Sequence, residues 1–307
     1  MTAQASMSAR AWAEMGLLAC LWGGSFLAVG VAVGDTGPTS LVALRVLGGC
    51  AVLWAYVLAR GLPVPRGARA WGAFLVMGTI NNALPFSLIA WGQQSIESGL
   101  AAILNASTAI MGVLVAALAF RDERLTAAKA LGVALGFAGV TVVIGPAALR
   151  RFDVTSLAQL AILGASLSYA LSGAFARRAF AGLAPEVAAA GMLTGSALVM
   201  VPVALALDGL PDAWPPAAWS AIAYLAVVAT ALAYLLFYRL LRRAGAGNTS
   251  LVTLLVAPVA ILLGAIVLGE QLPLRAYAGF LLLALGLAVL DGRLLRRPAE
   301  VLGDPAE

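Results

Sequence analysis

Residues 12–33 read WAEMGLLACLWGGSFLAVGVAV, an apolar run with a single charged residue, Glu14. About 20 such residues span the ~30 Å hydrocarbon core of a bilayer as an α-helix, because each residue rises ~1.5 Å. The run is apolar on every face and is about twice as long as a barrel strand, which favours a helix over a β-barrel. This stretch therefore predicts a membrane-spanning helix.

Similar runs follow along the whole chain, separated by turn and charge signals such as Gly34–Pro38. The ten predicted spans are residues 12–33, 40–59, 71–91, 98–120, 127–145, 156–176, 185–207, 217–238, 248–269 and 276–292. No loop between them is long enough for a soluble domain. The sequence predicts an all-α membrane protein with ten transmembrane helices, whose chemistry lies within the bilayer.

Composition excludes several other classes of protein. Hydrophobic residues make up 62% of the 307 residues and charged residues 11%, and the mean hydropathy is +0.98. Soluble domains are roughly 45–50% apolar and about 25% charged, so a soluble enzyme and a disordered chain are excluded. The net charge of +5 comes from basic residues between apolar runs rather than on one stripe, which argues against nucleic-acid binding.

Residues for catalysis and metal binding are scarce. The chain has no histidine, and its two cysteines, Cys20 and Cys50, both lie inside apolar runs. An intramembrane enzyme needs a nucleophile with a base, or paired carboxylates, and no acidic residue lies deep in a span. We therefore expect no enzyme activity, no metal site and no cofactor.

Lysine and arginine predict the orientation in the membrane. With the N-terminus in the cytoplasm, 15 of the 19 basic residues fall on cytoplasmic segments, and three, Arg150, Arg151 and Arg275, fall outside. The remaining one, Arg45, lies within the second span. This asymmetry predicts cytoplasmic N- and C-termini.

The chain contains an internal repeat. A shift of about 147 positions places Trp22 on Tyr169 and Ser25 on Ser172. The predicted units are residues 1–147 and 148–307, each with five spans. Because five is odd, the second unit enters the membrane from the opposite side, which gives two inverted five-helix repeats. Such inverted repeats are typical of secondary transporters that bind substrate near the midplane.

Several of these residues also carry a family resemblance. They are the segment LWGGSF at residues 21–26, Arg45, Pro258 and the matching span ends Glu123–Leu125 and Glu270–Leu272. With them the chain resembles the drug/metabolite transporter (DMT) superfamily, in its EamA-type ten-helix branch, and is most similar there to YddG-type aromatic amino-acid exporters. The resemblance implies a bacterial inner-membrane protein with a cavity lined mainly by spans 1, 3, 4, 6, 8 and 9.

The resemblance implies a secondary transporter that exports amino acids, aromatic and other neutral ones, and related small metabolites by alternating access. Alternatives are a broad drug/metabolite exporter, a facilitator of another class of small solute, and a channel or lipid scramblase. No midplane carboxylate is available to bind a proton, which favours a neutral or zwitterionic substrate without obligatory proton coupling. The predicted partners are a small-molecule substrate and the lipid bilayer, and both a monomer and a homodimer remain open.

Polar and aromatic residues in the middle of the spans form the candidate binding site. Trp22 and Ser25 share one helix face, and Tyr169 and Ser172 repeat that spacing. Such groups either replace the hydration shell of a substrate or hold helices together by hydrogen bonds, worth about 0.6 kcal/mol each. The predicted substrate-binding residues are Trp22, Ser25, Asn81, Asn82, Asn105, Tyr169, Ser172 and Tyr234.

Arg45 is the only charged residue well inside a span, roughly 8 Å from the predicted outer end. It either extends to the membrane interface as a structural anchor or has a functional role. In the functional case it acts in gating or attracts an anion, such as a substrate carboxylate.

Glycine and proline predict two features of the backbone. Gly48–Gly49 and the spaced pair Gly132 and Gly136 predict close helix packing. Pro85 lies four residues after Asn81, so it removes a backbone donor and leaves the carbonyl of Asn81 free.

Overall fold

The structure is a computed structural model that describes residues 8–120, 126–150, 154–180, 182–211, 213–249 and 252–290. Within these ranges the chain is helical and contains no strand, as the apolar runs predict. Glu123–Leu125, one of the paired span ends, and Arg151, one of the predicted outer arginines, lie outside the described residues.

The helices follow the predicted runs, and η marks a π-helical segment. In chain order they are α1 (Ala9–Thr36), α2 (Pro38–Ala59), α3 (Ala68–Gly78), η1 (Thr79–Ala83), α4 (Leu84–Gly92), α5 (Ser98–Asn105), α6 (Thr108–Ala119), α7 (Ala127–Arg150), α8 (Val154–Ala179), α9 (Pro185–Leu207), α10 (Pro216–Ala223), η2 (Tyr224–Leu232), α11 (Ala233–Thr249), α12 (Val252–Leu263), η3 (Gly264–Leu268) and α13 (Leu274–Leu290).

Seven helices of the described chain are long and apolar enough to cross a membrane, by length and composition. They are Ala9–Thr36, Pro38–Ala59, Ala68–Gly92, Ser98–Ala119, Thr155–Ala179, Pro185–Leu207 and Pro216–Arg243. Three shorter apolar helices cover Lys129–Gly145, Leu255–Leu268 and Leu274–Val289. These helices support a multi-pass membrane protein and leave the count of ten spans as a prediction.

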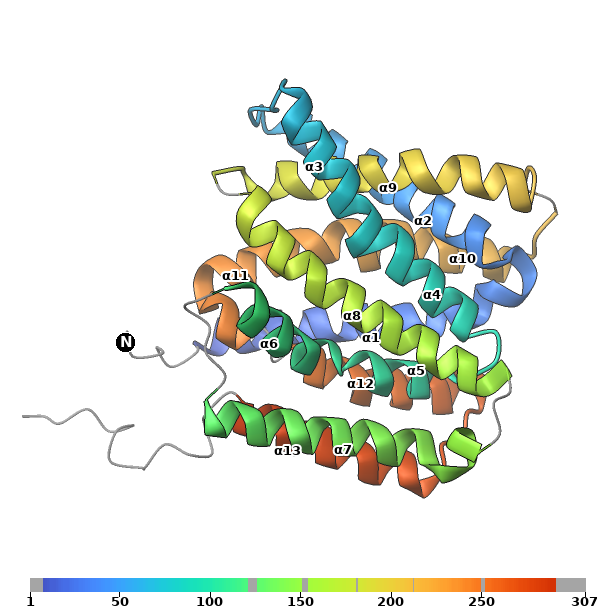
Figure 1. Ribbon diagram of the computed structural model, residues 1–307. Helices are drawn as coiled ribbons and strands as arrows, with labels where there is room; N and C mark the ends of the chain where they lie inside the picture. The colour runs from blue at the N-terminus through green and yellow to red at the C-terminus, as the bar shows by residue number, and fades with distance from the viewer. Residues whose placement is uncertain are drawn as a thin grey trace, which may run out of the picture.

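The helices lie side by side along one common direction, so the bundle has two ends (Figure 1). We call the end that holds Ala9 and Arg243 the terminal end, because α1 begins there. The other end, which holds Thr36 and Asp208, is called the distal end. The distal end lies at the right of Figure 1.

A π-helical turn interrupts the third apolar run at η1. There the backbone N–H of Leu84 bonds to the carbonyl of Thr79, five residues back rather than four. Pro85 follows at once, and its ring crowds the carbonyl four residues before it, which favours a wider turn. The π-helical turn contains Asn81 and Asn82, and that the carbonyl of Asn81 is free stays a prediction.

Helices α7 and α13 pack closely against each other along one side of the bundle, as Figure 1 shows. A Cβ on Gly279 would lie 2.7 Å from the carbonyl oxygen of Gly139. A Cβ on Gly286 would lie 2.7 Å from the backbone of both Gly132 and Gly136. The predicted role of Gly132 and Gly136 in close packing is confirmed, since only glycine leaves room for the two backbones.

We expect Gly279→Ala to destabilise the protein by about 1–3 kcal/mol, because its new methyl group meets backbone atoms that cannot move aside. Gly72→Ala is the matched control, since a Cβ there has no neighbour within 4 Å. Both changes improve helix propensity by about 1 kcal/mol, so their difference isolates the packing effect. Thermal unfolding in detergent measures it, and equal melting temperatures for the two variants would contradict this account of the helix pair.

Candidate functional site

A hydrogen-bonded network joins η1 to two helices of the C-terminal half. Asn81 donates from Nδ2 to the hydroxyl of Tyr234 at 3.2 Å, and that hydroxyl donates to Oδ1 of Asn82 at 2.7 Å. Ser172 on α8 donates to Oδ1 of Asn81 at 2.7 Å. Four of the eight predicted site residues are therefore in direct contact, near the middle of their helices.

Helix α8 adds further contacts to this network. Ser168 donates to the carbonyl oxygen of Ile80 at 2.6 Å, and Ser172 also lies 2.8 Å from the carbonyl oxygen of Tyr169. The ring of Tyr169 packs between two apolar clusters, one around α2 and α9 and the other around α5, α8 and α12. Tyr169 thus lies beside the network, without a side-chain hydrogen bond to it among the described residues.

Trp22 and Ser25 are placed differently. The hydroxyl of Ser25 donates back to the carbonyl of Trp22 at 2.7 Å, within α1 itself. The Trp22 ring lies 5.6 Å from the ring of Phe237, and Phe237 in turn contacts Tyr238, whose ring centroid is 6.3 Å from that of Tyr234. A chain of aromatic rings therefore connects Trp22 to the network, whereas the Ser25 hydroxyl bonds within its own helix.

Asn105 does not join the network. It lies at the end of α5, where two residues interrupt the helix before α6 begins at Thr108. Its carbonyl accepts hydrogen bonds from Thr108 at 2.7 Å and from Ser166 at 3.4 Å, while its side-chain oxygen is buried without a partner among the described residues. Asn105 thus marks a separate polar position against α8.

Arg45 faces the interior of the bundle. Only 7% of the residue is exposed, which contradicts the alternative in which it extends to the membrane interface. Its Nε donates to the hydroxyl of Thr230 at 3.0 Å, and its guanidinium carbon lies 3.7 Å from the centre of the Phe86 ring. Arg45 lies near the distal end of α2, but its side chain turns inward. The Phe86 ring offers it a cation–π contact there, and the Thr230 hydroxyl a hydrogen bond.

Phe86 and Tyr224 are two residues that the sequence interpretation missed. Phe86 follows Asn82 by four residues, so their shared helix face was a usable signal. Tyr224 lies on η2 and donates to the carbonyl of Leu21 at 3.0 Å, which ties η2 to α1. No local sequence pattern predicts that contact, because its two residues are 203 positions apart.

A groove of about 270 Å³ runs between α6 and α8. It begins at Tyr169 and Thr108 and reaches the terminal end of both helices, where the Arg177 guanidinium lies over the Phe120 ring at 4.3 Å. The groove is lined by Thr108, Gly112, Ala116, Phe120, Tyr169, Ala170, Gly173, Ala174 and Arg177. Tyr169 therefore belongs both to the groove and to the surroundings of the polar network.

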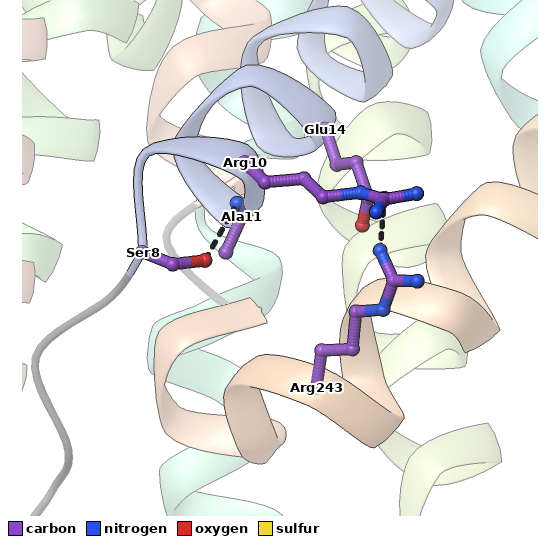
Figure 2. A network of polar contacts seen from close by, with 5 residues as sticks. All are labelled: Ser8, Arg10, Ala11, Glu14 and Arg243. Atoms are coloured by element: carbon purple, nitrogen blue, oxygen red, sulfur yellow. Dashed lines mark hydrogen bonds and ion pairs between the residues drawn. The ribbon is translucent and has the colours of Figure 1, made fainter.

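Ion pairs join helices at the terminal end. Glu14 on α1 binds Arg243 on α11 and lies 3.5 Å from Arg10 one turn earlier, and Ser8 caps the start of α1 (Figure 2). Arg242 binds Glu186, in the first turn of α9, at 2.9 Å. Both pairs use α11, so the terminal end of this helix is held to α1 and α9.

Two carboxylates close the distal end, and we call these contacts the distal clasps. Glu270, just after η3, accepts from the backbone N–H of Ser98 at 2.7 Å and of Gly99 at 3.0 Å. Asp208, just after α9, accepts from the N–H of Ser40 at 2.9 Å and from the hydroxyls of Thr39 and Ser40. Each carboxylate caps the N-terminus of a helix in the other half, where the helix dipole favours negative charge.

The clasp at Asp208 lies outside the apolar part of the helices. Partial burial raises the pKa of the Asp208 carboxyl, but hydrogen bonds from Thr39 and Ser40 outweigh this effect, so the pKa is below its usual value. The charged form is therefore the one that the folded protein prefers.

Metal-binding side chains do not gather in the part of the chain that the structure describes, where no group of three His, Cys, Asp or Glu residues could hold an ion. The site instead offers amide, hydroxyl, aromatic and guanidinium groups between apolar helices. Such groups can bind a small polar molecule by hydrogen bonding and ring contacts.

Apolar helices, a buried polar network and a groove beside it are typical of membrane transport proteins. The EamA-like transporter family model matches residues 11–145 and again 156–290. The chain belongs to the EamA-like transporter family, within the DMT superfamily, and is a small-molecule transporter rather than an enzyme.

Named relatives cover nearly the whole chain. It is 26% identical over 296 residues to a probable terminal-alkyne amino-acid exporter of Streptantibioticus cattleyicolor, covering 96% of this chain and 97% of that protein. It is 27% identical over 298 residues to a probable amino-acid metabolite efflux pump of Salmonella typhimurium, covering 94% and 97%. A solved crystal structure has the same fold, with a TM-score of 0.64, 23% identity and coverage of 92% and 96%.

We expect Asp208→Asn to lower stability at pH 7 by about 1 kcal/mol, because the charge-assisted hydrogen bonds to α2 are lost and solvent screens the exposed carboxylate. The depressed pKa means that this contribution is present above the usual pKa of 3.8 and is lost as the pH falls through the lower folded value. Unfolding at pH 7 and pH 3 should therefore show a difference between wild type and variant that shrinks in acid.

Asp35→Asn is the control for this experiment. Asp35 is exposed at the same end of the bundle, and its carboxylate makes no hydrogen bond within the described part of the chain. Its replacement should change stability equally little at both pH values. A difference between Asp208→Asn and wild type that persists at pH 3 would show that the carboxylate charge is not what holds the clasp.

Proposed function

We propose that this transporter exports amino acids, aromatic and other neutral ones, and related small metabolites across the bacterial inner membrane. The observation that carries the proposal is the match to the transporter family over both halves, together with relatives named as an amino-acid exporter and an amino-acid metabolite efflux pump. The buried amide and hydroxyl network supports it, because these groups suit a small polar molecule.

The proposed architecture is ten spans in two inverted five-helix repeats, residues 1–147 and 148–307, with both termini in the cytoplasm. The family model matches two successive segments whose starts lie 145 residues apart, which supports the repeat. The connection from α2 to α3 and its repeat counterpart, from α9 to α10, lie at opposite ends of the bundle (Figure 1). Opposite placement of equivalent loops is what inversion requires.

The proposed mechanism is alternating access, and polar contacts that can open and close at the distal end support it. The distal clasps seal α2 and α5 against the ends of α9 and η3. At the terminal end, the groove beside Tyr169 extends to Phe120 and Arg177. The distal end also has a groove, of about 170 Å³ between α2 and α9 beside the Asp208 clasp. In the proposed cycle the distal clasps open in one state of the carrier and form again in the other.

The proposed binding residues are Trp22, Ser25, Asn81, Asn82, Asn105, Tyr169, Ser172 and Tyr234, with Arg45 as the gating or anion-attracting residue. The direct contacts among Asn81, Asn82, Ser172 and Tyr234 favour a shared site for these four. Trp22 borders it through Phe237, and Asn105 lies nearer the groove, beside Thr108.

Counterflow in proteoliposomes tests the function. Unlabelled amino acid inside the vesicles should accelerate uptake of the same labelled amino acid, because a carrier exchanges substrate and a pore does not. A panel of amino acids and cationic drugs separates amino-acid export from broad drug export. No acceleration with any amino acid would exclude the proposed substrate class.

The aromatic residues allow matched variants in the same assay. Trp22→Ala and Tyr169→Ala should each lower counterflow by about tenfold, since ring contacts contribute on the order of 1 kcal/mol. Trp12→Ala and Tyr277→Ala are the controls, because both side chains are exposed on the outside of the bundle. Wild-type rates in Trp22→Ala and Tyr169→Ala would remove both residues from the site.

Cysteine labelling tests the inversion. In a chain with Cys20→Ala and Cys50→Ala, the variants Arg66→Cys and Pro211→Cys place one thiol in each of the two equivalent loops. Impermeant reagent added outside intact cells should label Pro211→Cys alone, and Arg66→Cys should react only after the membrane is opened. Labelling of both positions from one side would overturn the inverted architecture.

A further inference from the structure

Arg45 brings an unbalanced positive charge into the bundle. Its Nε donates to Thr230, and its guanidinium carbon lies over the Phe86 ring. Among the residues that the structure describes, no hydrogen bond reaches its two Nη groups and no ion pair includes it. A guanidinium has five N–H donors, so four remain unused. A buried charge without a counter-ion costs several kcal/mol, which calls for a partner from outside the described chain.

The acidic side chains of the described residues all lie at the ends of the bundle. Asp35, Glu97, Asp208 and Glu270 lie at the distal end, and Glu14 and Glu186 at the terminal end. The described chain therefore supplies no carboxylate at the depth of Arg45.

Asn82 adds a second unused donor. Its Oδ1 accepts the hydroxyl of Tyr234 at 2.7 Å, and Asn81 also approaches that oxygen, at 3.4 Å. Its Nδ2 has no partner in the described part of the chain, although the residue is fully buried. Leaving a buried amide donor unpaired costs about 1–3 kcal/mol.

Two helices place this amide close to Arg45. In the helical run from η1 to α4, Phe86 comes four residues after Asn82, and the Arg45 guanidinium lies over its ring. On the run from η2 to α11, Thr230 binds Arg45, and Tyr234, four residues later, binds Asn82. On each helix, the residue that contacts Arg45 and the residue at or bonded to Asn82 are therefore about one turn apart, with Cβ atoms roughly 5–6 Å from each other.

An anion with two acceptor oxygens would use the unpaired donors of Arg45 and Asn82 and balance the charge of Arg45. We propose that Arg45 and Asn82 bind the carboxylate of the transported molecule, an inference that rests on the proposed transport function and specifies its substrate class. A carboxylate accepts two parallel hydrogen bonds from a guanidinium and neutralises its charge. Tyr169, Tyr224 and Tyr234 lie within electrostatic range of Arg45.

The same arrangement disfavours other substrates. A cationic drug would meet the uncompensated charge of Arg45 without an acidic side chain beside it. An amide or ester of an amino acid keeps the size of the acid and loses the charge that Arg45 requires. The site therefore selects its substrates by their carboxylate, and it recognises the substrate side chain only by shape and ring contacts.

Direct binding to the purified full-length protein in detergent tests the inference separately from transport. The probes are L-phenylalanine and L-leucine, each compared with its own amide, and the readout is the dissociation constant from calorimetric titration. Wild type should bind each acid at least about tenfold more tightly than its amide. A factor of this size is what one charge-assisted hydrogen-bonded pair contributes to binding. Equal affinity for acid and amide, or no binding of either acid, would overturn the carboxylate site.

Variants assign the preference to Arg45. Arg45→Gln should reduce the ratio between acid and amide to about twofold or less, and Arg45→Lys, which keeps the charge, should retain a preference. Arg60→Gln is the control, because it removes a positive charge that is exposed at the end of α2. If Arg45→Gln kept the wild-type ratio of acid affinity to amide affinity, a group other than Arg45 would recognise the carboxylate.

Asn82→Asp provides a second test that does not depend on the folding of an Arg45 variant. An aspartate there supplies the missing anion within the chain, so the variant should lose acid binding by about tenfold or more and unfold at an equal or higher temperature than wild type. Retained acid binding by a less stable protein would contradict the proposal. A wild type that binds acids in this way but shows no counterflow would refute the transport function and leave the carboxylate site in place.

Discussion

Lipid offers no hydrogen-bond partner, and this constraint governs the whole molecule. Every backbone group must bond within its helix, and every polar side chain at depth must find a partner among its neighbours. The hydroxyl of Ser25 bonds back to its own helix, and Asn81, Ser172 and Tyr234 bond to one another. Groups that find no partner among the described residues, such as Nδ2 of Asn82, are informative because water does not offset the cost of leaving them unpaired.

The same constraint explains where the charges lie. At the terminal end, Glu14 and Glu186 bind Arg243 and Arg242 and hold α11 to its neighbours. At the distal end, Asp208 and Glu270 cap helix starts instead, so backbone N–H groups replace the arginines as partners. Capping contacts join residues of different halves across a small interface, which suits contacts that would open and close in the proposed carrier cycle.

Much of the fold was predictable, since hydropathy and length are local properties of the chain. Most helices follow the predicted spans within a few residues, although α11 continues to Thr249, well past the predicted end of its span at residue 238. Gly132 and Gly136 pack as predicted. The site was predictable only in part. Asn81, Asn82, Ser172 and Tyr234 do meet, but Asn105 lies apart beside the groove, and Ser25 bonds within its own helix. Depth in a span indicates which residues reach the midplane and says nothing about the direction in which each one points.

The sequence by itself determined the membrane class, the positions of the helices and the polar residue types at mid-depth, because burial in lipid selects composition residue by residue. Only the tertiary structure decided that Arg45 turns inward onto Phe86 and that Glu270 caps α5. These features depend on pairs of residues as far as 172 positions apart, whose contact is fixed by the rotation of each helix about its axis. That rotation results from the packing of all the helices together, and no single stretch of sequence encodes it.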